Sequence, residues 1–184
     1  KGESALINHL LSSTEVNLNF QDGSGKTPLH WAANKGFVDT SLALMDRGAD
    51  PNIQDRWGET PLHRTSRNGC LDIALVLIEN GANLNIQNNP GEIPLQVAAS
   101  YRRLAARKTV ELLQHPLHWV SKEGRGDSLI RLLNLGYDIE ALNDQGCTPL
   151  QVAYQEHQWN TAGILLAHGA LSEGVDVNTI FDAL

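Results

Sequence analysis

The sequence predicts a mainly α solenoid in which pairs of short helices stack side by side and are joined by β-hairpin-like loops. A TPLH-type motif begins at Thr27, Thr60 and Ile93, at intervals of 33 residues, and again at His115 and Thr148, also 33 apart. The motifs at Thr27, Thr60, His115 and Thr148 each precede a Leu-rich segment such as "SLALM" or "LIRLL", and a Gly-containing loop such as "GADPN" follows. A 33-residue period indicates repeats that bury their apolar faces against their neighbours.

Each unit carries its own signals for a first helix. Thr27, Thr60 and Thr148 can cap that helix, and the Pro after each Thr occupies the first turn, where its missing N–H costs nothing. Gly36 and Gly69 are expected to end the first helices of their units. The apolar and small residues three apart in each motif predict one inward-facing side.

A second helix is expected in each unit after a short turn. Asp39 and Asp72 are in place to begin it, and Gly48 and Gly81 to end it with a positive φ angle. We therefore expect a single domain over residues 1–184. Its parts are a partial N-terminal repeat at 1–21, repeats at 22–54, 55–87, 88–115, 116–142 and 143–171, and a C-terminal cap or linker at 172–184.

The period is interrupted between Leu113 and Pro116. The stretch "VELLQHPLHWV" runs from the end of one expected helix into the start of the next, without the polar loop that precedes the other motifs. Two explanations are open: the helix reverses within Gln114 and His115, or about 14 residues predicted by the period belong between Leu113 and Pro116. The lack of a Gly turn signal favours the second explanation.

These motifs resemble the ankyrin repeat, and the resemblance covers nearly the whole chain. It implies a non-catalytic adaptor or scaffold that binds another protein through loop tips and the inner face of the first helices. It also implies that His30, His63 and His118 tie neighbouring loops together and do not bind a metal. The alternative is a targeting domain of a larger enzyme, or a secreted pathogen effector, whose chemistry lies outside this chain.

Composition supports this expectation. The formal net charge of −7 disfavours a nucleic-acid surface, and no apolar run is long enough to insert into a membrane. Cys70 and Cys147 match no metal or redox spacing, which favours a cytoplasmic or nuclear location, or the host cytoplasm for an effector. No catalytic motif is present, and we expect no cofactor. The sequence does not predict an oligomeric state.

Partner-binding residues are expected at the loop tips and on the first helices. Trp57 is the leading candidate, because Trp and Arg dominate interface energetics and Arg56 and Arg67 are expected nearby; packing of Trp57 on its neighbouring loop is the alternative. Trp31 and Trp119 are expected to be partly buried packing residues. The full set of predicted contacts is Lys26, Asn34, Lys35, Arg56, Trp57, Glu59, Arg64, Arg67, Asn68, Glu92, Tyr101, Lys122 and Glu123.

Two smaller motifs have a structural and a functional interpretation. Asn52 and Asn85 resemble the targets of the asparaginyl hydroxylase that modifies ankyrin repeats, although forming a turn is the simpler role for Asn. The "RGD" at Arg125–Asp127 resembles an integrin-binding tripeptide, but it falls at an expected turn, where Gly126 and a capping Asp have structural reasons to be present.

Overall fold

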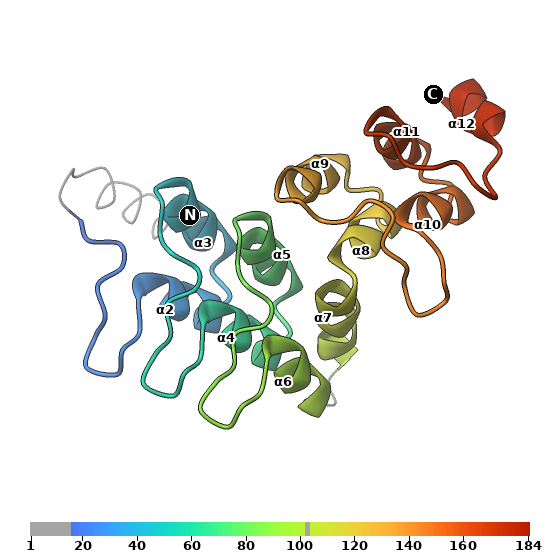
Figure 1. Ribbon diagram of the computed structural model, residues 1–184. Coiled ribbons are helices and arrows are strands. Elements are labelled where there is room, and N and C mark those ends of the chain that lie inside the picture. Colours follow the sequence, from blue (N-terminus) through green and yellow to red (C-terminus); the bar gives the residue numbers. More distant parts are fainter. Residues whose placement is uncertain (1–15, 102–103) are drawn as a thin grey trace. The chain divides into compact units, whose positions relative to one another are not determined.

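The computed structural model describes residues 16–101 and 104–184, and these form two compact units (Figure 1). Unit 1 runs to Leu113 and unit 2 begins at Gln114. The described residues of unit 1 contain three helix pairs, which are α2 (Pro28–Lys35) with α3 (Val38–Asp46), α4 (Pro61–Asn68) with α5 (Leu71–Glu79), and α6 (Pro94–Ser100) with α7 (Leu104–Gln114). The expectation about the N-terminal partial repeat falls mostly on residues outside the described part of the chain.

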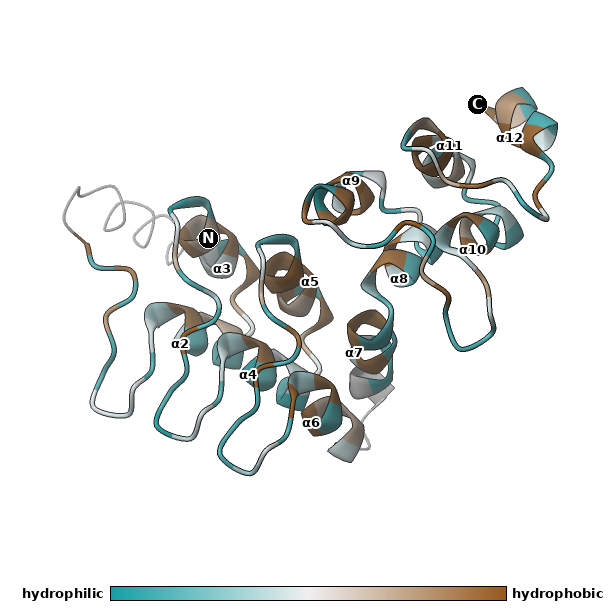
Figure 2. Ribbon diagram, in the orientation of Figure 1, coloured by the Kyte–Doolittle hydropathy of each residue, from teal (hydrophilic) through white to brown (hydrophobic). Residues whose placement is uncertain are grey.

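The first helices of unit 1 form one row, and the second helices lie behind them. α4 packs between α2 and α6, while α3 packs against α5. The core between the rows contains fully buried side chains such as Leu29, Leu62, Ile73 and Leu77. Figure 2 shows hydrophobic residues along α5 and hydrophilic residues along the loops of unit 1. The mainly α repeat architecture is therefore confirmed.

Unit 2 repeats the same design. Its helices are α8 (Pro116–Lys122), α9 (Gly126–Asn134), α10 (Pro149–Gln155), α11 (Trp159–Ala167) and α12 (Val177–Ala183). α8 packs on α9 and α10, and α11 packs on α10, α9 and α12. Leu129, Leu132, Leu150 and Leu165 form its buried centre. His115 alone separates α7 from α8 along the chain.

The predicted helix signals hold with one difference. Thr27 Oγ1 accepts from His30 N at 3.4 Å, and Gly36 ends α2 with φ of 77°. The second helices, however, begin one residue before the expected Asp: Asp39 lies in the first turn of α3, behind the N-cap residue Phe37. Asp72 and Asp127 are likewise in the first turns of α5 and α9 and are not their caps. A carboxylate in that position still favours the helix through the helix dipole.

The loops between repeats close tightly without forming strands in the described residues. In the loop before α4, Asp55 N donates to Glu59 O and Gly58 N donates to Asp55 O, both at 2.9 Å. The loop before α10 closes in the same way between Asn143 and Cys147. Each loop is thus hairpin-like in its turn, with a single backbone pair in place of a ladder.

Candidate functional site

The buried His residues determine how the loops meet the helices. His30 Nδ1 accepts from Thr27 N at 3.1 Å, and its Nε2 lies 2.9 Å from Glu59 O in the next loop. His63 makes the same contacts, with Nε2 lying 3.0 Å from Glu92 O. Because Nδ1 accepts, Nε2 carries the proton and donates to the carbonyl oxygen. Burial lowers the pKa of both imidazoles and keeps them neutral.

In unit 2, His118 continues the pattern. Its Nε2 lies 2.9 Å from Cys147 O in the following loop, and burial lowers its pKa. The predicted structural role of the three His residues is therefore confirmed by their hydrogen bonds. In the described residues, no group of three or more His, Cys, Asp or Glu side chains is arranged to hold a metal ion.

The second loop of unit 1 presents Trp57 at its tip. Asp55 Oδ1 accepts from Trp57 N at 2.9 Å and from Glu59 N at 3.0 Å, which fixes the backbone on both sides of Gly58. The Trp57 side chain is 50% exposed, and Asn89 N of the next loop donates to Trp57 O at 2.9 Å. A Cβ atom at Gly58 would lie 2.8 Å from Asn89 N, so only Gly permits this approach of the two loops.

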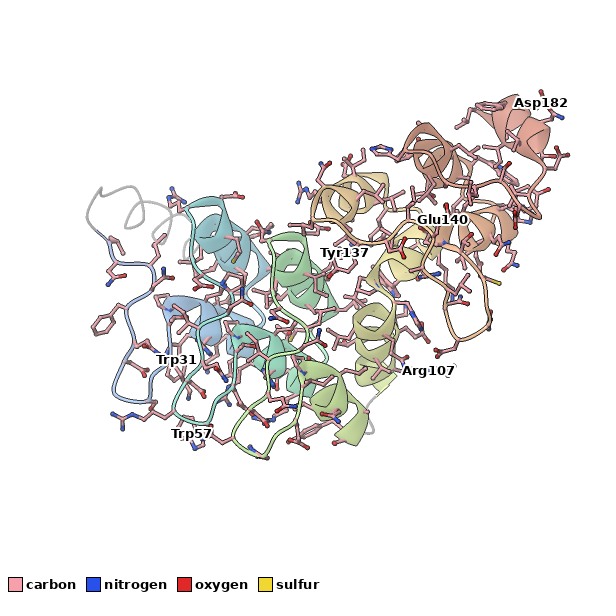
Figure 3. The ribbon with its side chains drawn as sticks, viewed as in Figure 1. Trp31, Trp57, Arg107, Tyr137, Glu140 and Asp182 are labelled. Atoms are coloured by element: carbon pink, nitrogen blue, oxygen red, sulfur yellow. The ribbon has the colours of Figure 1, made fainter. Side chains whose placement is uncertain are left out.

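A row of cations and aromatic rings runs along this face. Lys26 Nζ lies 4.8 Å from the ring centroid of Trp31 and 5.2 Å from that of Trp57. Arg64 Cζ lies 5.9 Å from the Trp57 centroid, and Arg67 Cζ lies 5.8 Å from the Tyr101 centroid. Figure 3 shows Trp31 and Trp57 on the side of unit 1 where the loops before α2 and α4 turn. These cation–π contacts hold the cations and the rings in fixed positions.

Buried carboxylates support the row from below. Arg64 Nη2 lies 2.7 Å from Asp55 Oδ2, and Arg64 Nε lies 2.9 Å from Glu59 Oε2. Arg67 forms a second ion pair with Glu59. Glu59 is only 4% exposed and its carboxylate is paired with the two Arg side chains, so its contact with a partner stays a prediction. Glu59 positions Arg64 and Arg67.

These side chains surround an open hollow of about 460 Å³. It is lined by Lys26, Trp57, Glu59, Arg64, Arg67, Asn88, Asn89, Pro90 and Glu92. Seven of these nine residues come from the loops, and the two Arg residues come from α4. The structure thus brings together six of the predicted contact residues around one concavity.

The other predicted contacts lie outside the hollow's lining. Asn68 Nδ2 donates to Asn34 O at 3.1 Å, which links the ends of α4 and α2, while Lys35 and Arg56 are exposed. Tyr101, at the end of α6, is connected to the lining of the hollow by its cation–π contact with Arg67. Lys122 and Glu123 are exposed residues of unit 2.

The two candidate hydroxylation residues differ in their contacts. Asn52 Oδ1 accepts from Asn83 N at 2.7 Å, and its Nδ2 donates to Gly81 O at 3.2 Å, so its side chain joins two neighbouring repeats. The side chain of Asn85 makes no such bond within the described part of the chain, and Asn85 is exposed. A structural role is therefore visible for Asn52, and hydroxylation of either residue stays a prediction.

Sequence reasoning misplaced Trp31 and overlooked Asp22 and Asp55. Both Trp31 and Trp119 are predicted to be partly buried packing residues, but Trp31 is 44% exposed beside Lys26, and Trp119 is more deeply buried than predicted, at 4% exposed. Asp22 Oδ2 accepts from Trp31 Nε1 at 3.0 Å, and backbone N–H groups, first that of Lys26 and then that of Ser24, lower the pKa of Asp22. The signal in the sequence was a repeated spacing of nine residues, from Asp22 to Trp31 and from Asp55 to Arg64.

The comparison with known proteins agrees with this geometry. Residues 1–88 and 38–116 match a family model described as ankyrin repeats, in three copies. The chain is similar to "Probable protein S-acyltransferase 23" of Arabidopsis thaliana, with 40% identity over 48 residues, which is 26% of this chain and 9% of that protein. It is also similar to "Acyl-CoA-binding domain-containing protein 2" of Arabidopsis thaliana, with 39% identity over 46 residues, which is 24% of this chain and 13% of that protein.

These curated relatives are far longer than the region they share with the chain. Only repeat sequence is matched, so the similarity supports the fold and carries neither acyl transfer nor acyl-CoA binding to this protein. In the described residues, no helix is long and apolar enough to cross a membrane.

Proposed function

We propose, on the premise that this chain belongs to the ankyrin repeat family, that it is a non-catalytic recognition module whose partner protein binds at the hollow of unit 1 beside Trp57. Ankyrin repeats are generally protein–protein interaction modules. The observation that carries the proposal is Trp57 itself, a half-exposed indole held at a loop tip by Asp55 and Asn89. A rigid aromatic side chain loses little conformational entropy on binding.

The surroundings of Trp57 support the same assignment. Partly buried, ion-paired Arg side chains and an open concavity are typical of the centres of protein interfaces, where Trp, Tyr and Arg are enriched. Arg64 and Arg67 are held by Asp55 and Glu59, so these side chains are ordered in the absence of a partner. The partner would therefore meet a preformed surface.

The experiment is affinity capture from source cells with the tagged full chain, compared between wild type and Trp57→Ala. We expect a specific protein to be retained by wild type and its retention to fall about tenfold or more with Trp57→Ala. Phe37→Ala is the matched control, because Phe37 is an exposed aromatic residue of unit 1 that does not line the hollow. Equal capture by all three proteins would overturn the proposal.

Delivery of a catalytic domain in a longer polypeptide is the second candidate. One observation favours it: a match restricted to a short stretch of repeats within a relative whose name denotes an acyltransferase. The intact mass of the protein isolated from its source tests this candidate directly. A mass near 20.1 kDa would leave recognition as the whole function of the chain.

A further inference from the structure

Lys26 is a cation whose place is fixed by aromatic rings. Its ammonium lies 4.8 Å from the Trp31 centroid and 5.2 Å from the Trp57 centroid. Trp31 is oriented by its hydrogen bond to Asp22, and the loop that carries Trp57 is closed by Asp55. The two Trp residues are about half exposed, and Lys26 is itself half-buried and lines the open hollow.

The cations around the hollow differ in whether a carboxylate lies beside them. Arg64 and Arg67 are paired with Asp55 and Glu59 beneath them. Lys26, in contrast, has no carboxylate within 4.0 Å among the described residues, and the nearby Asp22 acts on it only at longer range. The unmatched charge at the Trp57 end of the hollow is therefore positive.

We propose that Lys26 binds the carboxylate of an Asp or Glu side chain in an extended segment of the partner protein, and that the face of Trp57 contacts the apolar part of the same segment. This inference rests on the proposed function and adds the chemical class of the ligand. The ammonium is already ordered by cation–π contacts, so less side-chain entropy is lost when the ion pair forms. A single unmatched Lys on a chain of net charge −7 favours an acidic peptide over a nucleic acid, which needs several clustered cations.

Glu92 limits how many acidic groups the hollow accepts. It lines the same hollow, and Asn88 Nδ2 lies 3.4 Å from its Oε2. A second acidic residue near Glu92 would be repelled, so we expect one acidic position in the bound segment. Glu92→Gln should consequently strengthen the binding of more acidic segments.

The probe is a display library of random 12-residue peptides, selected on the immobilised full chain. We expect the selected peptides to be enriched in Asp or Glu at one position next to a large apolar residue. The best peptide is then compared with its matched Asn or Gln version on wild type, Lys26→Gln and Lys35→Gln. Lys35 is an exposed Lys of α2 that does not line the hollow, so both substitutions remove one positive charge and only one changes the site.

Wild type and Lys35→Gln should prefer the acidic peptide over its amide version by about twofold to fivefold, the range of an exposed ion pair. Lys26→Gln should lose that preference while retaining its thermal unfolding midpoint. The preference should also weaken between 50 mM and 500 mM salt, because exposed charge pairs are screened.

The outcomes separate this inference from the proposed function. Peptides that depend on Trp57 but show no acidic preference, or equal preferences in Lys26→Gln and Lys35→Gln, would overturn the role of Lys26 and leave the recognition module standing. Failure to select any peptide that depends on Trp57 would overturn both. Binding of a single-stranded oligonucleotide with the same dependence on Lys26 would overturn the assignment to an acidic peptide.

Discussion

The hairpin-like loops before α2, α4, α6 and α10 fall into two kinds. Both kinds close in the same way, but they precede first helices with different residues at the matching position. The loops at Asp22 and Asp55 begin with an acid, and the loops at Asn88 and Asn143 begin with an amide. In every case Oδ1 accepts the backbone N–H four residues on: Glu59 N lies 3.0 Å from Asp55, and Cys147 N lies 3.0 Å from Asn143. The turn alone therefore does not require a negative charge.

The two kinds of loop differ in the second terminal atom of the side chain, which is Oδ2 in Asp and Nδ2 in Asn. Asp22 Oδ2 accepts from Trp31 and Asp55 Oδ2 accepts from Arg64, each nine residues along the chain on the first helix. Nine residues after Asn88 and Asn143 the chain carries Val97 and Val152, which are 2% and 8% exposed. Acidic loops thus accompany a polar helix face, and amide loops accompany a buried one. This pairing confines the row of cations and indoles to the first two repeats of unit 1.

The His bridge is common to both kinds of loop, and removing it should have the largest effect. His63→Ala leaves Thr60 N–H and Glu92 C=O without their partner and opens a cavity at a fully buried side chain. We expect a loss of about 2–4 kcal/mol in the free energy of unfolding. Urea unfolding followed by circular dichroism measures it, with Lys35→Ala as an exposed control. A loss below about 1 kcal/mol would show that the bridge adds little to the repeat.

Asp55→Asn converts an acidic loop into an amide loop and should have the next largest effect. The turn survives, because Asn Oδ1 can still accept from Trp57 N and Glu59 N, but Arg64 loses a buried partner. We expect a loss of about 1–3 kcal/mol. Asn143→Asp is the converse control and should give no stabilisation, because Val152 offers no donor.

The double variant Asp55→Asn/Arg64→Val sharpens this test. It reproduces the combination that the chain itself uses at Asn88 and Val97. If the acid serves mainly to hold Arg64, the double variant should be less destabilised than the sum of the two single variants, with a coupling of about 1 kcal/mol or more. Strictly additive losses would mean that Asp55 and Arg64 act independently.

Much of the fold was predictable because the same local sequence signals occur in several repeats. The period, the Thr–Pro starts and the glycine ends are local signals, so both bounds of α2 and α4 and the start of α10 followed closely. The start of the second helix was less visible. The N-cap residues Phe37, Cys70 and Arg125 have no side-chain oxygen that could accept a hydrogen bond. The Asp residue of each helix lies two positions after the N-cap, in the first turn.

The sequence placed the candidate contacts at loop tips and first helices but did not indicate which of them are buried. Lys26, Trp57, Arg64 and Arg67 line one hollow, and binding of a partner there stays a prediction. The exposure of each side chain depends on which neighbours contact it, and here the contacts join a loop to the helix that follows it. Glu59 is buried because two Arg residues of α4 reach back to it, a contact that no single motif states.

Stability should fall as the solution becomes acidic, because burial lowers the pKa of His30, His63 and His118 below the ordinary value of 6.5. Below pH 6.5 the His residues of the unfolded chain bind protons more readily than those of the folded chain. Their contribution to the free energy of unfolding is therefore complete above pH 6.5 and declines below it. We expect a lower urea midpoint at pH 5.5 than at pH 7.5.

Gln already replaces this His in other repeats, which supplies the control. Gln151 Oε1 accepts from Thr148 N at 2.9 Å, the same contact that His63 Nδ1 makes with Thr60 N. His63→Gln should therefore fold and should lose less stability between pH 7.5 and 5.5 than wild type does. An unchanged pH dependence in His63→Gln would mean that other groups govern the acid response.

The smallest effect is expected at Trp119, which follows neither kind of loop. The residue nine positions earlier is Val110, and Trp119 Nε1 is buried with no hydrogen-bond partner in the described residues. Trp119→Phe removes this unpaired N–H while keeping an aromatic ring, so the two contributions should offset to within about 1 kcal/mol in the free energy of unfolding. Trp119→Ala, by comparison, should lose about 3 kcal/mol or more.

A large loss of unfolding free energy with Trp119→Phe would indicate that the indole N–H has a hydrogen-bond acceptor. A loop of the predicted length between Leu113 and Pro116 would place a residue nine positions before Trp119 at the base of a turn, where Asp22 stands relative to Trp31. If that residue is an Asp, its carboxylate can accept from the indole, and removing the N–H would then cost about 1–3 kcal/mol. Measured on the protein from its source, a loss of that size would support the full 33-residue period over a chain that reverses at His115.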